Sequence, residues 1–362
     1  MSCSFSEYSF PVGVTAYIAH PNRPYSSSET EFPHLWKSLD SFGIQVTQDL
    51  DAAVVFISIN HSPRHLRAFR EGEGSDKLRV LVRLEPRATY PVQYLDRIVN
   101  KYDLVITPGS LRHETTRLMW PYFYQINPLR PISPAPTLHD LIGELLTRND
   151  RNLWDCRPYL LTLIASNKTS PTKYSNYALR RRAVKELTNR GLTSFGEKWD
   201  SPLPTRLAER TRIAWGALKT SYFPNLVALT DGLFTNFPEV KGQVQDKHSI
   251  VRKSKFSLVI ENDNHYVSEK IIDALVGGSL PFYMGGNLEL VGIHSDVVRT
   301  VINFEAVIDT ILALTPGEID QWRQNAFNYV ISKEFVKAWS GEEVYQSIAQ
   351  LIWQQTKRNS KF

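Results

Sequence analysis

Short apolar runs alternate with amphipathic segments along the first third of the chain. The apolar runs lie at residues 12–18, 44–47, 52–59, 78–84 and 104–107. Between them, residues 32–42 and 63–71 carry apolar side chains at helical spacing. A short apolar run bounded by turn residues is typical of a strand buried on both faces of a parallel sheet. The pattern therefore predicts a parallel α/β domain over roughly the first 130 residues.

A proline-rich stretch, NPLRPISPAP at residues 127–136, interrupts this pattern. It is unsuited to a helix interior and stiff enough to separate two domains. We expect a first Rossmann-like domain at residues 1–135 and a connecting segment with a helix at 136–157. A second Rossmann-like domain at 158–340 and a C-terminal helix and tail at 341–362 follow.

The second half contains two units of strand, polar loop and helix. The first has a strand at 159–165 and a basic helix at about 176–189 that ends before Gly191. The second has a strand at 256–260, a polar loop, a helix, and a further strand at 280–284. Two such units predict a nucleotide-type domain with its ligand at the carboxyl edge of the sheet. Amphipathic helices are expected at 304–314, 319–331 and 344–354.

The start of the helix in the second unit is its most informative feature. Ser268 is suited to cap the helix, and Gly277 with Gly278 is suited to end it. Lys270 falls in the first turn, where the helix dipole disfavours a cation by a few tenths of a kcal/mol. An anionic ligand bound there would reverse that effect. Glu269 suits the dipole and could also accept hydrogen bonds from sugar or ribose hydroxyls.

Composition narrows the class of protein. The chain has 362 residues, a formal net charge of +5 and a pI near 9.0. This basic charge is compatible with binding to nucleic acid, to an anionic membrane surface or to an anionic small substrate. The basic residues are dispersed, so nucleic acid ranks low. With only Cys3 and Cys156, neither a disulfide framework nor a zinc site is indicated. There is no signal-peptide pattern or membrane span, which predicts a cytoplasmic protein, with the inner membrane face as a second location.

The segment 255–286 resembles the carboxyl-terminal signature of the α-1,3-fucosyltransferases, glycosyltransferase family 10. That signature combines a Lys-Phe strand, Glu-Asn, a short loop, Tyr, a Ser or Thr followed by Glu-Lys, an apolar helix, a small-residue pair and a Pro-bearing strand ending in Gly. The matching residues are Lys255, Phe256, Glu261, Asn262, Tyr266, Ser268, Glu269, Lys270, Gly277, Gly278, Pro281 and Gly285.

Weaker matches extend this resemblance in pieces from about residue 78 to residue 290. In the second half they are Ser166-Asn167 with Arg180 and Leu187, and Phe195-Gly196 with Trp199. In the first half they are Glu85-Pro86, Tyr102-Asp103 and Trp120-Pro121-Tyr122. Residues 1–77 carry none.

The resemblance implies a GT-B fold, in which two Rossmann-like domains face each other across a cleft. It implies an acceptor site in the first domain, a GDP-fucose site in the second, and inverting transfer of fucose to a hydroxyl of a glycan acceptor. No metal or other cofactor is required in that reaction. The donor half has no Asp-x-Asp motif, and we interpret Asp49-Leu50-Asp51 in the first domain as a solvated turn.

Inverting transfer needs a base for the acceptor hydroxyl and, without a metal, cations for the departing diphosphate. Lys270 is the first candidate cation and Arg180, by its match to the family's donor-binding arginine, the second. A solvated lysine at a helix end is the plain alternative for Lys270. Arg181 and Arg182 adjoin Arg180, so the match to the family's donor-binding arginine could be shifted by one residue.

Glu85 is the candidate base. A carboxylate at the end of a buried strand, just before Pro86, would lie at a cleft edge where its pKa can be raised. The alternative is a glutamate that forms a salt bridge with Arg83 or Arg87.

Asn262, Tyr266 and Glu269 are predicted to contact the nucleotide or the sugar. Tyr266 could instead pack at the helix entry, and Asn262 could be a turn residue. Glu261 beside a diphosphate should point away or pair with a cation. His265 is interpreted as a lone polar loop residue, and the basic run 246–255 mainly as a solvated face.

The sequence therefore favours a GDP-fucose-dependent fucosyltransferase. Two alternatives remain: a glycosyltransferase that uses another nucleotide sugar, and a catalytically silent nucleotide- or sugar-binding protein that keeps the donor loop without the base. The acceptor, the linkage and the oligomeric state are not predicted.

Overall fold

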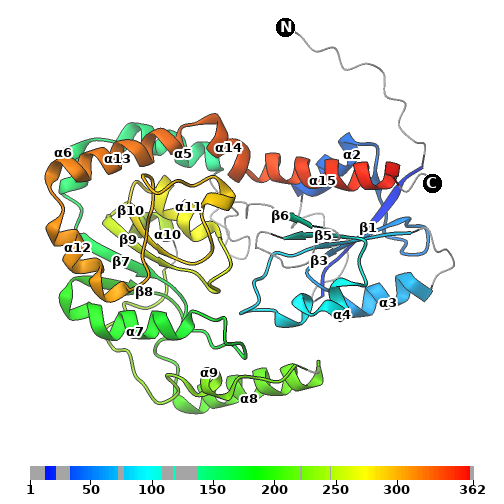
Figure 1. Cartoon of the computed structure of the whole chain (residues 1–362), viewed down its shortest axis with the longest axis horizontal. Helices are drawn as coiled ribbons and strands as arrows, with labels where there is room; N and C mark the ends of the chain where they lie inside the picture. Colours follow the sequence, from blue (N-terminus) through cyan, green and yellow to red (C-terminus); the bar gives the residue numbers. More distant parts are fainter. Residues whose placement is uncertain are drawn as a thin grey trace, which may run out of the picture.

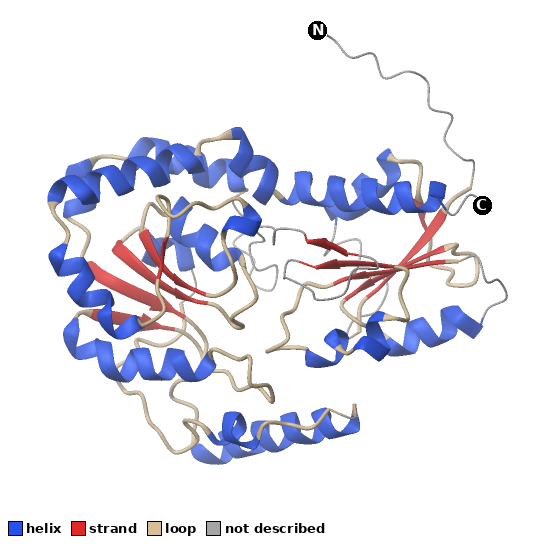
Figure 2. Cartoon of the chain, viewed as in Figure 1, coloured by secondary structure: helices blue, strands red, loops and turns tan. Residues whose placement is uncertain are grey.

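Two α/β domains, each built on a parallel sheet, make up the chain (Figures 1 and 2). The computed structural model describes residues 13–21, 33–71, 77–107, 117–119, 137–220, 222–244 and 246–358. The proline-rich segment 127–136 and the motif at 120–122 lie outside these ranges. Within the described ranges, every pair of neighbouring strands is parallel, as the apolar runs predict.

The first sheet has six strands in the order β2-β1-β3-β4-β5-β6. Their bounds are β1 Thr15–Ala19, β2 Gln45–Val46, β3 Val55–Ile59, β4 Leu78–Val82, β5 Leu104–Thr107 and β6 Arg117–Met119. Helices α2 (Pro33–Ser41), α3 (Pro63–Glu71) and α4 (Asp96–Val99) connect them. All five residues of β3 are buried, because helices cover both faces of the sheet.

The last helix of the chain returns to this first domain. α15 (Gly341–Arg358) runs alongside α2 (Figure 1), and its apolar face, including Val344, Ile348 and Ile352, joins the core made by β1, β3, β4 and β5. The first described strand and the last helix thus belong to the same domain, and the second domain forms from elements between residues 138 and 339.

The second sheet has five strands in the order β11-β10-β9-β7-β8. Their bounds are β7 Tyr159–Ile164, β8 Leu192–Phe195, β9 Ser254–Ile260, β10 Leu280–Met284 and β11 Arg299–Thr300. The helices of this domain are α5 Leu138–Arg148, α6 Arg151–Asp155, α7 Tyr177–Leu187, α8 Leu203–Lys219, α9 Leu226–Thr230, α10 Lys247–Val251, α11 Glu269–Val276, α12 Val307–Ala313, α13 Pro316–Val330 and α14 Lys333–Trp339.

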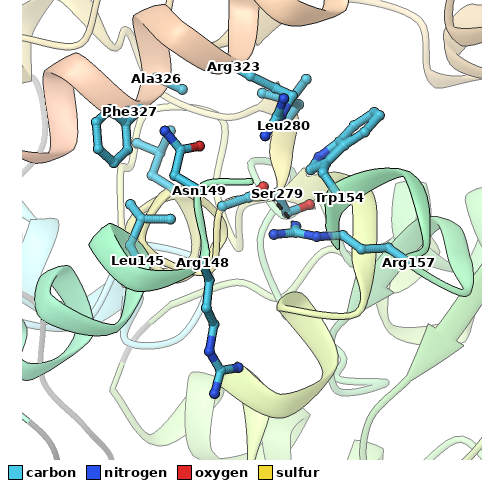
Figure 3. A pocket seen from close by; sticks show the side chains of 12 residues that line it. Leu145, Arg148, Asn149, Trp154, Arg157, Ser279, Leu280, Arg323, Ala326 and Phe327 are labelled. Carbon is cyan, nitrogen blue, oxygen red and sulfur yellow. Dashed lines mark hydrogen bonds between the residues drawn. The ribbon is translucent and has the colours of Figure 1, made fainter. Parts of the chain in front are cut away.

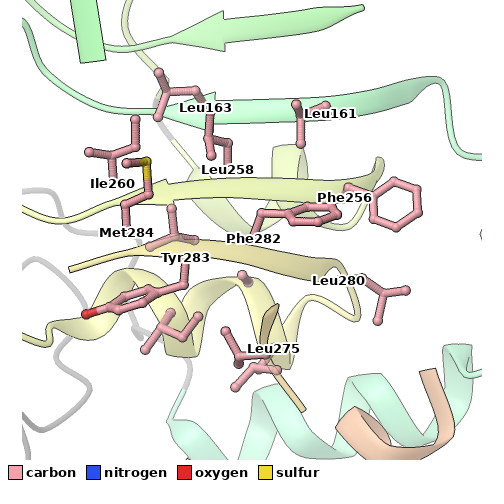
Figure 4. Packing of buried hydrophobic residues seen from close by; sticks show 14 of the residues in the cluster. Leu161, Leu163, Phe256, Leu258, Ile260, Leu275, Leu280, Phe282, Tyr283 and Met284 are labelled. Carbon is pink, nitrogen blue, oxygen red and sulfur yellow. The ribbon is translucent and has the colours of Figure 1, made fainter. Parts of the chain in front are cut away.

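The core of the second domain is packed between the sheet and these helices (Figure 4). Phe256 and Phe282 on neighbouring strands pack against each other and against Trp322 of α13. Residues 137–157 also contribute to this core, through Leu138, Leu141, Leu145 and Trp154 of α5 and α6.

The predicted strands and helices agree with the structure within a few residues at each end. Ser268 caps α11, Gly278 adopts φ +67° after it, and Gly191 adopts φ +113° after the helical segment that follows α7. Strands β6, β8 and β11 and helices α6 and α14 were missed. None of the helices in the described ranges combines the length and apolarity needed to cross a bilayer.

Candidate functional site

The order in which successive strands are added to the second sheet reverses between β7 and β9. β7 pairs with β8 on one side and with β9 on the other, so the loops that follow β7 and β9 separate at this point. In open parallel sheets the crevice between such loops is where ligands bind. The loop after β7 contains Asn167 and Lys168, and the loop after β9 contains residues 261–268. This crevice would therefore lie at the segment 255–286, which resembles the fucosyltransferase signature.

Glu261 organises the loop after β9. Its carboxylate is fully buried, and it accepts hydrogen bonds from the backbone N–H of Ser268 (2.7 Å) and from Ser268 Oγ (2.7 and 2.9 Å). Lys270 Nζ lies 3.3 Å from Glu261 Oε2 and donates to Ser268 Oγ at 2.8 Å. A Cβ on Gly285 would lie 2.5 Å from Glu261 Cγ, so this position requires glycine. The expected pairing of Glu261 with a cation is confirmed, and its partner is Lys270.

Lys270 is charged and already has counter-ions. Burial alone would lower the pKa of Lys270, but the carboxylates of Glu261 and Glu269 outweigh burial and raise it. Burial likewise opposes ionisation of Glu269, yet Lys270 and Lys247 bring its pKa below the ordinary value. The carboxylates of Glu261 and Glu269 therefore offset the unfavourable interaction of Lys270 with the helix dipole. The position of Lys270 in the first turn does not by itself require an anionic ligand.

Arg180 and Asn262 act as a pair. Arg180, on α7, is buried, and its Nε and Nη2 donate to the main-chain oxygen of Ile260 at 3.0 and 2.6 Å. Nη2 also donates to Asn262 Oδ1 at 2.7 Å. Its Nη1 makes no hydrogen bond with any described residue. Arg180 thus fixes the end of β9 and the Asn262 amide, and the N–H groups of its Nη1 are not used by the described residues.

The two neighbouring arginines serve other contacts. Arg181 binds Asp231, Asn167 Oδ1 and the main-chain oxygen of Lys168. Arg182 pairs with Glu305 on the exposed side of α7. Of the three arginines, Arg180 is therefore the one at the loop after β9.

Glu85 is held at the end of β4 by hydrogen bonds to its main chain. Asn60 Oδ1 accepts from the N–H groups of Leu84 (2.9 Å) and Glu85 (3.0 Å), and Glu85 O accepts from Gln93 Nε2 (2.8 Å) and Tyr94 Oη (3.0 Å). These contacts fix the backbone that carries the Glu85 carboxyl group.

Charged side chains of the second domain act on the pKa of the Glu85 carboxyl group. Burial raises its pKa, and Glu269 adds to this, while Lys168 and Lys270 of the second domain act in the opposite direction. Its salt bridge with Arg83 or Arg87, the alternative considered from the sequence, is not formed. Arg83 instead donates to Gln93 O at 2.6 Å, and Arg87 stacks 4.2 Å from the centre of the Tyr174 ring.

Tyr266 connects the two domains. Its ring is buried, and its hydroxyl donates to the main-chain oxygen of Leu84 at 2.5 Å. Its own main-chain oxygen accepts from Gly286 N (3.0 Å) and Tyr283 Oη (3.1 Å). Tyr266, predicted to contact the donor, ties the loop after β9 (residues 261–268, the candidate donor loop) to the residue that precedes Glu85.

Sequence reasoning missed Lys168 and Lys247. Lys168 follows the noted Ser166-Asn167 pair, and only the fold brings its charge near Glu85. Lys247 Nζ lies 2.6 Å from the buried carboxylate of Asp273, and His248 lies 3.6 Å from the same group. The prediction that the run 246–255 is mainly a solvated face is therefore wrong for Lys247 and His248, which anchor α10 to α11.

One minor expectation is confirmed. Asp49 Oδ1 accepts from the N–H of Asp51 at 2.9 Å in an exposed turn, as expected for Asp49-Leu50-Asp51. His265, interpreted as a lone polar residue, instead packs edge-on against Tyr174 and lies 3.6 Å from the Asp263 carboxylate, with its side chain 47% exposed. Among the described residues, no three His, Cys, Asp or Glu side chains gather as a metal site.

A small basic cavity lies at the opposite edge of the second sheet, near the start of β10 (Figure 3). Arg148, Arg157 and Arg323 line it, but its volume of about 20 Å³ is that of a single water site. Arg157 donates to the main-chain oxygens of Ser254 (2.8 Å) and Gly278 (2.7 Å). This arginine closes the amino-terminal edge of the sheet, and the cavity is not the candidate site.

Comparison with solved structures places this architecture among known folds. A solved α1,3-fucosyltransferase superposes with a TM-score of 0.55 at 15% identity, covering 97% of this chain and 92% of that chain. An α1,3-fucosyltransferase with GDP-fucose gives 0.54 at 15%, covering 100% and 95%. Anabaena HepE in complex with UDP and glucose gives 0.54 at 10%, covering 94% and 99%. The chain has a GT-B fold.

No protein-family model and no curated protein matches the sequence. At identities of 10–15% the likeness to solved structures concerns the fold. The predicted fold class, two Rossmann-like domains facing across a cleft, is confirmed.

Proposed function

We propose that this chain is an inverting, metal-independent glycosyltransferase that transfers fucose from GDP-fucose to a hydroxyl of a glycan acceptor. The observation that carries the proposal is the hydrogen bond from Tyr266 to Leu84, the residue before Glu85, which holds the candidate base of the first domain against the loop after β9 of the second. Lys168, Lys270 and Glu269 of the second domain act on the pKa of Glu85. A base and cations from opposite domains are what single-displacement transfer from a nucleotide diphosphate sugar requires.

In the proposed reaction, Glu85 takes the proton of the acceptor hydroxyl. The acceptor oxygen then bonds to the anomeric carbon of the donor sugar as the bond from that carbon to the diphosphate breaks, which inverts its configuration. GDP leaves with the bonding electrons. Burial helps Glu85 as a base, since a raised pKa gives the carboxylate a stronger affinity for the incoming proton.

Cations of the second domain stabilise the negative charge on the departing diphosphate. Lys270 and Lys168 supply charge, and Arg180 Nη1 supplies a directed N–H group. Asn262 and Glu269, at the same loop, would contact the nucleotide or the sugar. Arg180 sets the orientation of Asn262 through the hydrogen bond at 2.7 Å.

The identity of the donor rests on the family-like segment and on the structural neighbour that holds GDP-fucose. One observation favours a second candidate, a UDP-glucose-type donor, because the Anabaena HepE structure with UDP-glucose also superposes, with a TM-score of 0.51 at 10% identity. Thermal unfolding with each nucleotide separates them. Stabilisation by GDP but not UDP supports the proposal, and the reverse preference contradicts it.

The third candidate is a binding protein without catalysis. It predicts that Glu85 has no part in the activity of the cleft. The position of Glu85 beside the charges of the donor loop argues for an enzyme, and its replacement by alanine, which should abolish turnover and leave GDP binding nearly intact, tests that point.

A further inference from the structure

A second cavity lies between the two domains. Its volume is about 540 Å³, within the range of small-molecule sites. Arg87, Tyr94 and neighbouring residues of the first domain form one wall, and Tyr174, Tyr222 and Phe223 are among those of the second domain that form the other. Phe223 is 88% exposed although it lines the cavity, so an apolar surface is open to a ligand there.

The charge of this cavity is positive. Arg87 and Lys173 line it, and no carboxylate does so among the described lining residues. Arg87 makes no hydrogen bond or ion pair with any described residue, and its buried Nε has no acceptor. Its guanidinium stacks 4.2 Å from the centre of the Tyr174 ring, and Lys173 Nζ lies 5.4 Å from the same ring. An arginine without an anionic partner at a domain boundary is suited to bind one from a ligand.

The cavity adjoins both halves of the candidate site. Tyr94, in its first wall, donates to the main-chain oxygen of Glu85 at 3.0 Å. Tyr174, in its second wall, packs against His265 of the donor loop, and the next residue, Ser175, forms a β-bridge with Asp263. A ligand in this cavity would therefore lie beside both the candidate base and the donor loop.

We infer that this cavity binds the acceptor, and that the acceptor is an acidic sugar. Its oxyanion, a carboxylate or a phosphate, is bound by Arg87 and Lys173, and the aromatic side chains of Tyr174, Tyr222 and Phe223 pack against its ring. This inference rests on the proposed transferase function and names its acceptor class. It also explains why Arg87, two residues after Glu85, has no anionic partner among the described residues.

Calorimetric titration tests the inference with three probes: glucuronic acid, glucose 6-phosphate and glucose. GDP and UDP are both present at saturation, so that phosphate groups cannot report on the nucleotide site. The unmodified protein should bind the two acidic sugars at least about tenfold more tightly than glucose, as expected for one charge-assisted contact. The better of the two acidic probes identifies the oxyanion.

Single substitutions then assign the preference to the cavity. Arg87→Gln and Lys173→Gln should each reduce it, and Arg87→Lys should retain part of it. Lys173 is exposed and makes no hydrogen bond with a described residue, so its substitution leaves folding unaffected. Lys337→Gln is the control, because it removes the same charge from an exposed position on α14. Equal affinity for glucose and both acidic sugars overturns the inference, as does a preference that survives Arg87→Gln and Lys173→Gln.

Donor hydrolysis, measured without any acceptor, separates this inference from the proposed function. Hydrolysis of a nucleotide sugar by a protein with no acidic-sugar preference supports the transferase and overturns the acceptor assignment. Arg87-dependent binding of acidic sugars without donor hydrolysis supports an acidic-sugar site and overturns the transferase.

Discussion

The Tyr266 hydroxyl donates a 2.5 Å hydrogen bond to the main-chain oxygen of Leu84 in the other domain. Leu84 directly precedes Glu85, and Tyr266 directly follows the variable part of the donor loop. The contact therefore joins the candidate base to the candidate donor site. It gives the two halves of the proposed reaction a fixed relative position.

Replacing Tyr266 by phenylalanine should weaken this alignment. A buried hydrogen bond contributes about 1 kcal/mol, so turnover should fall by roughly three- to tenfold while GDP still stabilises the protein. Steady-state kinetics and thermal unfolding measure the two effects. Tyr159→Phe is the matched control, because the Tyr159 hydroxyl makes no hydrogen bond with a described residue. Unchanged turnover in Tyr266→Phe would show that the contact does not position Glu85.

Replacing Glu85 by glutamine tests its role as the base. The amide keeps the shape of the side chain but cannot take a proton, so transfer should fall by about 10²- to 10⁴-fold. Nucleotide-induced stabilisation should persist. Glu289→Gln, on the exposed segment after β10, is the control. A Glu85→Gln variant that keeps most of its rate would remove Glu85 from the mechanism.

The pH dependence of transfer should report on Glu85. Burial raises its pKa, so the acidic limb of kcat/KM should have its midpoint above the ordinary range of a glutamate, with activity rising as the carboxyl group ionises. Lys168 lowers this pKa, and Lys168→Gln should therefore move the midpoint to higher pH. A midpoint that stays fixed in this variant contradicts the assignment of the limb to Glu85.

The same pKa shift has a consequence for stability. A carboxyl group whose pKa is higher in the folded protein binds its proton more tightly there than in the unfolded chain. Its ionisation therefore costs stability as the pH rises through the folded pKa. Glu85→Gln should unfold at a higher temperature than the unmodified protein at pH 7, and the difference should shrink below the unfolded pKa. A variant that is less stable at pH 7 would contradict this sign.

The ion pair between Lys247 and Asp273 should stabilise the packing of α10 against α11, the helix that follows the candidate donor loop. Removing one partner of a buried pair costs about 3–5 kcal/mol, which we reduce to about 1–3 kcal/mol because the Lys247 side chain is 37% exposed to screening solvent. Lys247→Met should lower the free energy of unfolding by that amount in urea. Adding Asp273→Asn should restore part of the loss. No recovery in the double variant would show that the charge pair is not the cause.

The sequence predicted what depends on local pattern. The short apolar runs located most strands, and Ser268, Gly191 and Gly278 marked helix ends that the structure confirms. The pairing of Glu261 with a cation was also predictable, because a buried carboxylate is costly unless a cation pairs with it. These features involve residues within about one strand–helix unit of each other.

The sequence could not predict contacts between distant segments. Tyr266 and Leu84 are 182 residues apart, and only the packing of the two domains brings them together. Lys168 has no motif of its own, and its relation to Glu85 also depends on that arrangement. Lys247 stands in a run of mixed charge whose exposure depends on Asp273 of the next helix. Strand β11 has two residues, too few for a periodic pattern.

The release of nucleotide diphosphate from a panel of nucleotide sugars, without an acceptor, tests the central claim most directly. We predict slow GDP release from GDP-fucose, faster than release from any UDP-sugar and lost in Glu85→Ala, which should still bind GDP. Release from no nucleotide sugar, or release from GDP-fucose that is unchanged in Glu85→Ala, would contradict the account.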